Sequence, residues 1–216
     1  MDKKDLLDCS PIRAFDNATN GGLKAGEIGL ITSAKGMGKS AVLVQFGLDA
    51  LLAGKQLVHV SFDAQGSSVN YWYSTVFAEI AKKKNISNEA ELKADVMRNR
   101  TTLKFNPENF TLQKLVNTIS AMKGAGFEVS SLVIDDTFAK EATAADMKAV
   151  LDFAKSENLV IWMTSTCDSD KLNDCASADV LASISAVLHL ESTGNGVALK
   201  VLKLREATPE TSLKLD

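Results

Sequence analysis

The stretch "EIGLITSAKGMGKSAVLVQFGLDALLAG", residues 27–54, decides the fold expected for this chain. Residues 27–33 form a short apolar run that is typical of a buried strand. A glycine-rich turn follows, and from Lys39 apolar residues recur at helical spacing as far as Gly54. Strand, turn and helix in this order predict a turn that presents backbone N–H groups and a helix N-terminus to an anion.

The turn "SAKGMGKS", residues 33–40, matches the phosphate-loop (Walker A) pattern GxxxxGK[ST] except at its first position, where Ser33 replaces glycine. Ser33 costs little where its φ is negative, and about 1 to 2 kcal/mol in the left-handed region. In this pattern Lys39 reaches the β and γ phosphate oxygens and the Ser40 hydroxyl holds Mg²⁺. We therefore expect ATP and Mg²⁺ to bind at Ser33, Ala34, Lys35, Gly36, Met37, Gly38, Lys39, Ser40 and Ala41.

The rest of the chain alternates strand-like and helix-like segments. Strands are expected at 56–62, 101–105, 130–136 and 159–166, and helices at 69–85 (capped by Ser67 or Ser68), 88–100 (capped by Ser87), 110–126 and 144–158 (capped by Thr143). This alternation predicts an α/β fold with a mostly parallel sheet flanked by helices on both faces. The tail, 185–216, reads as paired strands with a turn at "TGNG", so we expect antiparallel strands at the C-terminal edge of a single domain, 1–216.

Two acids end the apolar strand "LVIDD", residues 132–136. A phosphate loop works with an acid at the end of another buried strand, and Asp135 has this place. We expect Asp135 to hold the Mg²⁺ shell and Asp136 to orient the attacking water.

Residues 15–63, "FDNATNGGLKAGEIGLITSAKGMGKSAVLVQFGLDALLAGKQLVHVSFD", resemble the opening of the RecA-superfamily ATPases of the KaiC and DnaB type. The shared features are GG-L-x-x-GE, a strand, the Walker A loop, a helix and a strand with a polar tip. The resemblance implies a RecA-like, KaiC-like single ATPase domain that covers most of residues 10–216, although it does not extend to residues 66–110.

The segment "LKVLKLREATPET", residues 199–211, resembles the late strand and turn with a K-x-R pair in these families. There the pair reaches the γ-phosphate of a neighbouring subunit, which implies this role for Lys203 and Arg205. An arginine supplied in this way contributes about 10³- to 10⁵-fold in rate. The resemblance thus implies a homo-oligomer, a ring such as a hexamer, with its sites at subunit interfaces.

The stretch "SFDAQGSS", residues 61–68, stands where these ATPases carry the catalytic acid, and it contains no glutamate. The KaiC and DnaB register places Asp63 on the acid, one methylene short. The RecA recombinase register places Gln65 there, and an amide does not take a proton; loss of a general base costs about 10²- to 10⁴-fold. Both registers predict an ATP binder that is a weak ATPase, with slow or absent turnover.

Composition and charge bear on the partners. The net charge is −3, and the loop at 167–179 holds four acids and one lysine, so a nucleic-acid partner is not expected. The aromatic run at 71–77 holds too many rings for one helical stripe, so some of them are expected to face a protein partner or a neighbouring subunit, whereas core packing is expected for most. We expect a nucleotide-dependent assembly or signalling component; the alternative is a DnaB/RecA-like ATP-hydrolysing motor on single-stranded nucleic acid.

The remaining sequence features concern the location of the protein, its cysteines and its histidines. No apolar run reaches the roughly 18 residues of a membrane span, and the N-terminal residues lack the apolar core of a secretory signal, so a cytoplasmic protein is expected. Cys9, Cys167 and Cys175 form no CxxC pair and are expected to be buried or incidental thiols. His59 and His189 lie in apolar strand runs, which predicts structural roles.

Overall fold

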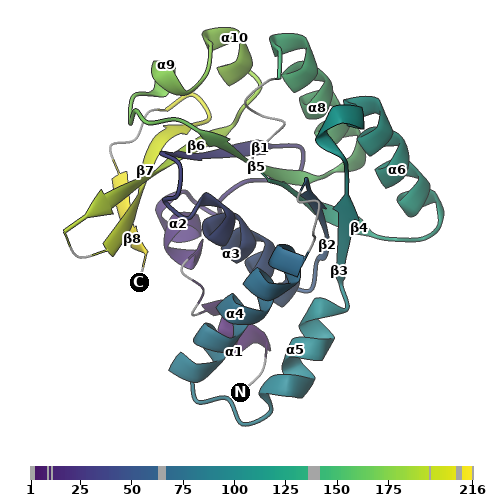
Figure 1. Cartoon of the computed structure of the whole chain (residues 1–216), viewed down its shortest axis with the longest axis vertical. Helices are drawn as coiled ribbons and strands as arrows, with labels where there is room; N and C mark the ends of the chain where they lie inside the picture. Colours follow the sequence, from purple (N-terminus) through teal and green to yellow (C-terminus); the bar gives the residue numbers. More distant parts are fainter. Residues whose placement is uncertain are drawn as a thin grey trace.

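A mixed eight-stranded sheet forms the centre of the protein, in the order β3-β2-β4-β5-β1-β6-β7-β8 (Figure 1). The computed structural model describes residues 3–8, 10, 12–62, 67–135, 142–194, 196–207 and 211–215. The strands are β1 (Ile28–Ser33), β2 (Gln56–Ser61), β3 (Arg100–Lys104), β4 (Val129–Ile134), β5 (Val160–Thr166), β6 (Ala186–Thr193), β7 (Gly196–Leu204) and β8 (Thr211–Leu215). All pairings from β3 to β6 are parallel, and β6-β7 and β7-β8 are antiparallel. The predicted α/β fold with an antiparallel C-terminal edge is confirmed.

Helices cover both faces of the sheet, as predicted (Figure 1). They are α1 (Lys3–Asp8), α2 (Ile12–Ala18), α3 (Lys39–Leu52), α4 (Ser67–Lys83), α5 (Glu89–Met97), the 3-10 turn η1 (Pro107–Asn109), α6 (Leu112–Gly124), α8 (Ala144–Glu157), α9 (Leu172–Cys175) and α10 (Ala178–Leu181). Buried side chains of α1 to α5 share one apolar cluster, and those of α6, α8 and α10 share a second. Strands β1, β2, β4, β5 and β6 contribute residues to both clusters, because successive side chains of a strand point to opposite faces.

The structure agrees with one predicted helix cap and disagrees with another. Thr143 caps α8 in a full capping box with Asp146, as the sequence predicts. The prediction that Ser87 caps the next helix is wrong, because α5 begins at Glu89 and Asn88 is its N-cap residue. Helices α1 and α2 were not expected; they are one to two turns long, which is too short for a periodicity signal.

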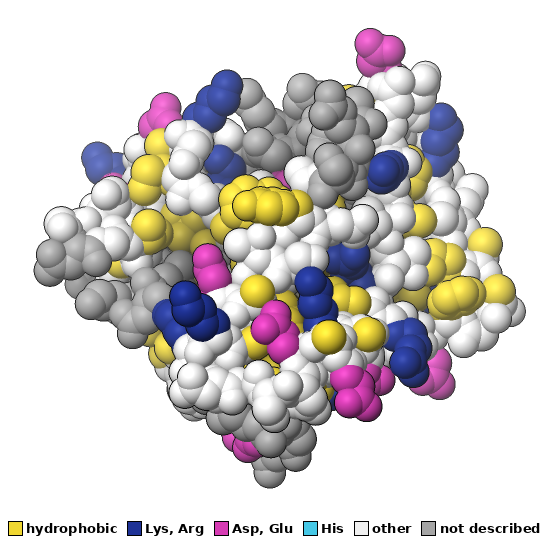
Figure 2. Space-filling view, turned by 60° about the horizontal axis from the view of Figure 1, so that its bottom comes forward, with side chains coloured by type: hydrophobic (Ala, Val, Ile, Leu, Met, Phe, Trp, Pro, Cys, Tyr) yellow, Lys and Arg dark blue, Asp and Glu magenta, His cyan; other side chains and the backbone are white. Residues whose placement is uncertain are grey.

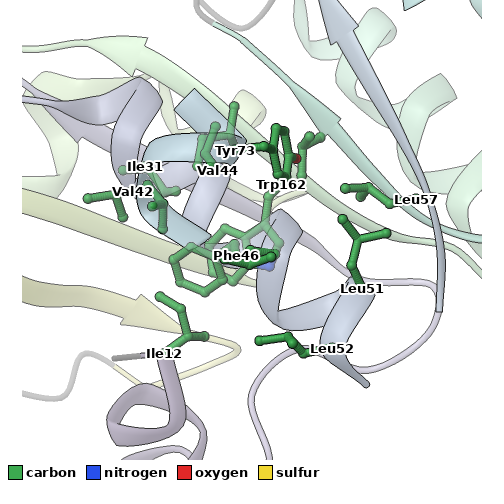
Figure 3. Packing of buried hydrophobic residues seen from close by; sticks show 14 of the residues in the cluster. Ile12, Ile31, Val42, Val44, Phe46, Leu51, Leu52, Leu57, Tyr73 and Trp162 are labelled. Atoms are coloured by element: carbon green, nitrogen blue, oxygen red, sulfur yellow. The ribbon is translucent and has the colours of Figure 1, made fainter. Parts of the chain in front are cut away.

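The core on the α3 face is built around aromatic rings (Figure 3). Phe46 of α3 lies against Trp162 of β5, with ring centroids 4.1 Å apart, and Phe15 of α2 meets the edges of both rings. Trp162 is accommodated by Gly29, its parallel partner on β1, where an added Cβ would lie 2.2 Å from the indole ring. Glycine at this position of β1 therefore leaves room for the Trp162 side chain.

The chain changes direction across the sheet at β1. The connection through α3 carries it from β1 to β2, past β5 and β4, whereas the connection after β5 carries it to β6 on the other side of β1. In open α/β sheets, ligands bind at the carboxyl ends of the strands where the direction reverses in this way. Residues 34–38, which follow the carboxyl end of β1, lie at such a point.

None of the described helices combines the length and the apolar character that a membrane crossing requires.

Candidate functional site

Two glycines shape the loop between β1 and α3. Gly36 and Gly38 have φ of 84° and 95°, in the left-handed region that favours glycine. A Cβ added at either position would meet no atom within 4 Å, so the backbone conformation, and not a lack of space, calls for glycine. Ser33 lies in strand β1 and has no positive φ, so serine at the first motif position carries no backbone strain.

Helix α3 begins directly behind this loop. Gly38 is its N-cap residue and, having no side chain, makes no capping hydrogen bond to the N–H groups of the first turn. Lys39 is only 7% exposed, and its Nζ lies 3.4 Å from the Ser33 carbonyl oxygen and 3.5 Å from that of Ala34. The lysine thus folds back over the loop, and it brings a positive charge beside the free N–H groups of α3.

Three hydroxyl and carboxyl groups from different elements meet beside the loop. The Ser40 hydroxyl of α3 donates a 3.1 Å hydrogen bond to Asp135 Oδ1, which follows β4. The Thr164 hydroxyl of β5 donates to the same carboxylate oxygen at 3.0 Å. The structure therefore brings together Ser40 and Asp135, the hydroxyl and the carboxylate that the sequence assigned to one site from the loop and the strand end.

The donor set at Ser40 and Asp135 fits Mg²⁺. Two neighbouring oxygen ligands of octahedral Mg²⁺ lie about 3 Å apart, because each Mg–O distance is about 2.1 Å. The observed Ser40–Asp135 separation of 3.1 Å is close to this value. Among the described residues, no group of three or more His, Cys, Asp or Glu side chains is arranged to hold a metal. Mg²⁺ does not need one, since it commonly binds through one or two protein ligands, waters and phosphate oxygens.

Lys203 and Arg205 lie away from this loop within the same chain. The Lys203 ammonium donates to the carbonyl oxygens of Leu181 and Ile184 at the end of α10. Arg205 forms a two-pronged ion pair with Glu27, at 2.8 and 2.9 Å. Glu27 precedes the amino end of β1, whereas the loop follows its carboxyl end, so the two sites flank opposite ends of this strand. A role of the pair in a neighbouring subunit stays a prediction.

Three other expected site residues fall outside the described residues. These are the alternative catalytic acids, Asp63 and Gln65, and the water-orienting Asp136. Ala34, Lys35, Met37 and Ala41 lie in the loop and the first turn of α3 as expected.

A buried polar cluster lies under α4, which the sequence did not predict. His59 of β2 is buried, and its Nδ1 lies 3.2 Å from the Tyr73 hydroxyl. The Arg100 guanidinium sits 4.3 Å from the centre of the Tyr73 ring, a cation–π contact. Burial, aided by the Arg100 charge, lowers the pKa of His59 to about 3. His189 is buried as well, and its Nδ1 lies 2.9 Å from the Thr32 hydroxyl. The burial of both histidines agrees with the expected structural roles.

The low pKa of His59 predicts a loss of stability in mild acid. The unfolded chain protonates this histidine near pH 6.5 and the folded protein only near pH 3, so the unfolded state binds more protons in between. The contribution is complete above pH 6.5 and falls by about 1.4 kcal/mol for each pH unit below it. Urea unfolding near pH 6.5 and near pH 5 should show a loss of about 2 kcal/mol from this group.

The His59→Phe variant is the control for this pH effect. Its unfolding free energy should depend less steeply on pH, and His189, whose pKa burial also lowers, should account for part of the remaining slope. Equal pH slopes for the wild-type protein and the variant would contradict the assignment to His59.

No model of a known protein family matches this chain, and no curated protein sequence matches it either.

Proposed function

We propose that this chain binds ATP together with Mg²⁺ at the loop of residues 34–38. One observation carries the proposal: Ser40 and Asp135, which are 95 positions apart in the sequence, bring a hydroxyl and a carboxylate within 3.1 Å at the start of α3. Beside them are the buried Lys39 and two glycines with positive φ, Gly36 and Gly38. The N-terminus of α3 also lies here, and its N-cap residue has no side chain. Each of these features attracts phosphate or its metal ion.

A RecA-like fold of the KaiC and DnaB type is part of the proposal. It rests on the resemblance of residues 15–63, since no family model matches the chain. The parallel strand order supports it, because the loop after β1 and the acid after β4 lie at the same edge of the sheet. We assign Lys39 to the β and γ phosphates, Ser40 and Asp135 to Mg²⁺, and the backbone N–H groups of the loop to the remaining phosphate oxygens. Bound Mg²⁺ neutralises phosphate charge.

Turnover in this proposal is slow or absent, because either Asp63 or Gln65 replaces the usual glutamate. The protein then uses ATP as a signal for assembly with copies of itself or with a protein partner. Steady-state phosphate release at several per second from purified protein would contradict the slow turnover. Size-exclusion chromatography with light scattering in ATP, in ADP and without nucleotide tests the assembly, for which we expect a larger mass in ATP.

The outer surface supports a protein partner over nucleic acid. On the face shown in Figure 2, lysine and arginine side chains are interspersed with acidic ones. Helix α4 exposes Tyr71 (65%) and Trp72 (38%), whereas Tyr73 and Phe77 are buried. Exposed aromatic side chains are common anchors of protein interfaces. Tight, salt-sensitive binding of labelled single-stranded DNA would instead favour the motor alternative.

A pair of variants tests the metal assignment. Binding of a fluorescent ATP analogue should tighten when Mg²⁺ is added, and Ser40→Ala and Asp135→Asn should each reduce this gain by about 10-fold or more, because each removes a metal ligand. Ser156→Ala is the matched control, since this hydroxyl bonds a carbonyl within α8, far along the chain from the loop. Tight nucleotide binding that ignores Mg²⁺ and both substitutions would contradict the proposed site.

A further inference from the structure

Two cysteine sulfurs lie in contact at the carboxyl edge of the sheet. Cys167 comes directly after β5, and Cys175 is the last residue of α9. Their Sγ atoms are 3.0 Å apart, although the residues are eight positions apart and form no CxxC pair. A covalent S–S bond is about 2.05 Å long, so the sulfurs need to approach by about 1 Å to form one.

The segment between the two cysteines is folded into a compact turn. The Ser169 carbonyl oxygen accepts from both thiols, at 3.3 Å from Cys167 and 3.5 Å from Cys175. The Ser169 hydroxyl accepts from the Lys171 N–H and donates to Asp174. These bonds hold both thiols on the same side of the turn.

The pair also adjoins the start of the phosphate loop. The Cys167 N–H donates to the Ser33 carbonyl oxygen at 3.0 Å, and the Cys175 sulfur lies 3.7 Å from the Thr32 hydroxyl. Cys167 is 8% exposed and Cys175 is half-buried, so a small oxidant reaches Cys175 more readily.

We propose that Cys167 and Cys175 form a dithiol site that is oxidised reversibly to an intrachain disulfide. One thiolate sulfur attacks one oxygen of hydrogen peroxide, and the O–O bond breaks, which gives a sulfenic acid. The other oxygen leaves as hydroxide and is protonated to water. The second sulfur then displaces the sulfenic hydroxyl, which also leaves as water. Two thiols and one peroxide thus give one disulfide and two waters. A dithiol such as dithiothreitol reverses the step by thiol–disulfide exchange.

The surroundings set the conditions for this reaction. Burial, together with the hydrogen bond that the Cys175 thiol shares with the Cys167 sulfur, raises the pKa of the Cys175 thiol to about 12, and the nearby Asp174 adds to this. The Thr32 hydroxyl acts in the opposite direction. Cys175 is therefore protonated at neutral pH, and because the thiolate is the reactive form, oxidation should be faster under mildly alkaline conditions.

The test counts thiols in the 216-residue chain and does not depend on nucleotide binding. Protein with the substitution Cys9→Ser keeps only the pair. It is treated with hydrogen peroxide at mildly alkaline pH in the presence of a metal chelator, unfolded, and alkylated with a maleimide. We expect two additions before oxidation, none after it, and two again after dithiothreitol. Wild-type protein should go from three additions to one, since it has three cysteines.

The product and the single-cysteine variants complete the test. Digestion of oxidised wild-type protein should yield a peptide pair that joins Cys167 to Cys175, with a mass about 2 Da below the sum of the thiol forms. Cys9→Ser protein with Cys167→Ser or Cys175→Ser in addition should give no intrachain link. Two maleimide additions after oxidation of the Cys9→Ser protein, or covalent dimers in place of the intrachain link, would overturn the inference.

Discussion

Replacing Lys39 with alanine is expected to weaken ATP binding by roughly 30- to 1,000-fold. Lys39, the first residue of α3, is buried, and its Nζ lies 3.4 and 3.5 Å from the Ser33 and Ala34 carbonyl oxygens. Removing one partner of a buried, hydrogen-bonded charge pair costs about 2 to 4 kcal/mol, which corresponds to this change in affinity. Isothermal titration calorimetry with ATP and Mg²⁺ measures it directly.

The matched control for Lys39→Ala is Lys55→Ala. Lys55 is exposed and follows the other end of α3, so both substitutions remove one positive charge next to the same helix. The control should bind ATP as the wild-type protein does. Circular dichroism of both variants shows whether the fold is kept. Equal affinities of folded Lys39→Ala and wild-type protein would exclude the proposed role of this lysine.

A second large effect is expected for Gly29→Ala, which should destabilise the fold by about 3 kcal/mol. The new Cβ would lie 2.2 to 2.7 Å from three atoms of the Trp162 ring, which is 6% exposed and packed against Phe46. The ring has little room to retreat, because protein interiors are close-packed. Thermal unfolding should show a fall in the midpoint of roughly 6 to 12 °C.

A double-mutant cycle isolates this contact. In a Trp162→Leu background the ring is absent, and the added cost of Gly29→Ala should fall below about 1 kcal/mol. Gly124→Ala is the control, since a Cβ there meets nothing within 4 Å and φ is not positive; it should be neutral or slightly stabilising. Additive effects of Gly29→Ala and Trp162→Leu would show that the ring contact is not the cause.

Most of the sheet was predictable because its strands carry strong local signals. The segments at 130–136 and 159–166 contain the apolar runs 132–134 and 159–163, and the structure places β4 and β5 there. The contact between Ser40 and Asp135 was predictable as well, because carboxyl ends of parallel strands share an edge and the motif names the residues.

Contacts that depend on tertiary register were not predictable. Nothing near Gly29 in the sequence indicates that Trp162 lies opposite it, since parallel strand register is set by the whole sheet. The K-x-R pattern of Lys203 and Arg205 likewise carries no trace of the Glu27 partner, which lies 178 positions from Arg205. The sequence predicted buried or incidental thiols at Cys167 and Cys175, because they form no spacing motif. The folding of the turn between them brings the two sulfurs together, and the sequence gives no sign of this contact.

The position of β5 between β1 and β4 sets the distance between these two strands as well as their order in the sheet. Neighbouring strands are about 4.8 Å apart, so the strand that leads to the loop and the strand that leads to Asp135 are separated by about 10 Å. Ser40, in the first turn of α3, contacts Asp135 across the width of β5. The Thr164 hydroxyl of β5 donates a hydrogen bond to the same carboxylate. One strand more or fewer would displace the carboxylate by about 5 Å. The fit between Ser40 and Asp135 therefore depends on the strand order of the sheet, and insertions in connections at the opposite edge of the sheet should leave it intact.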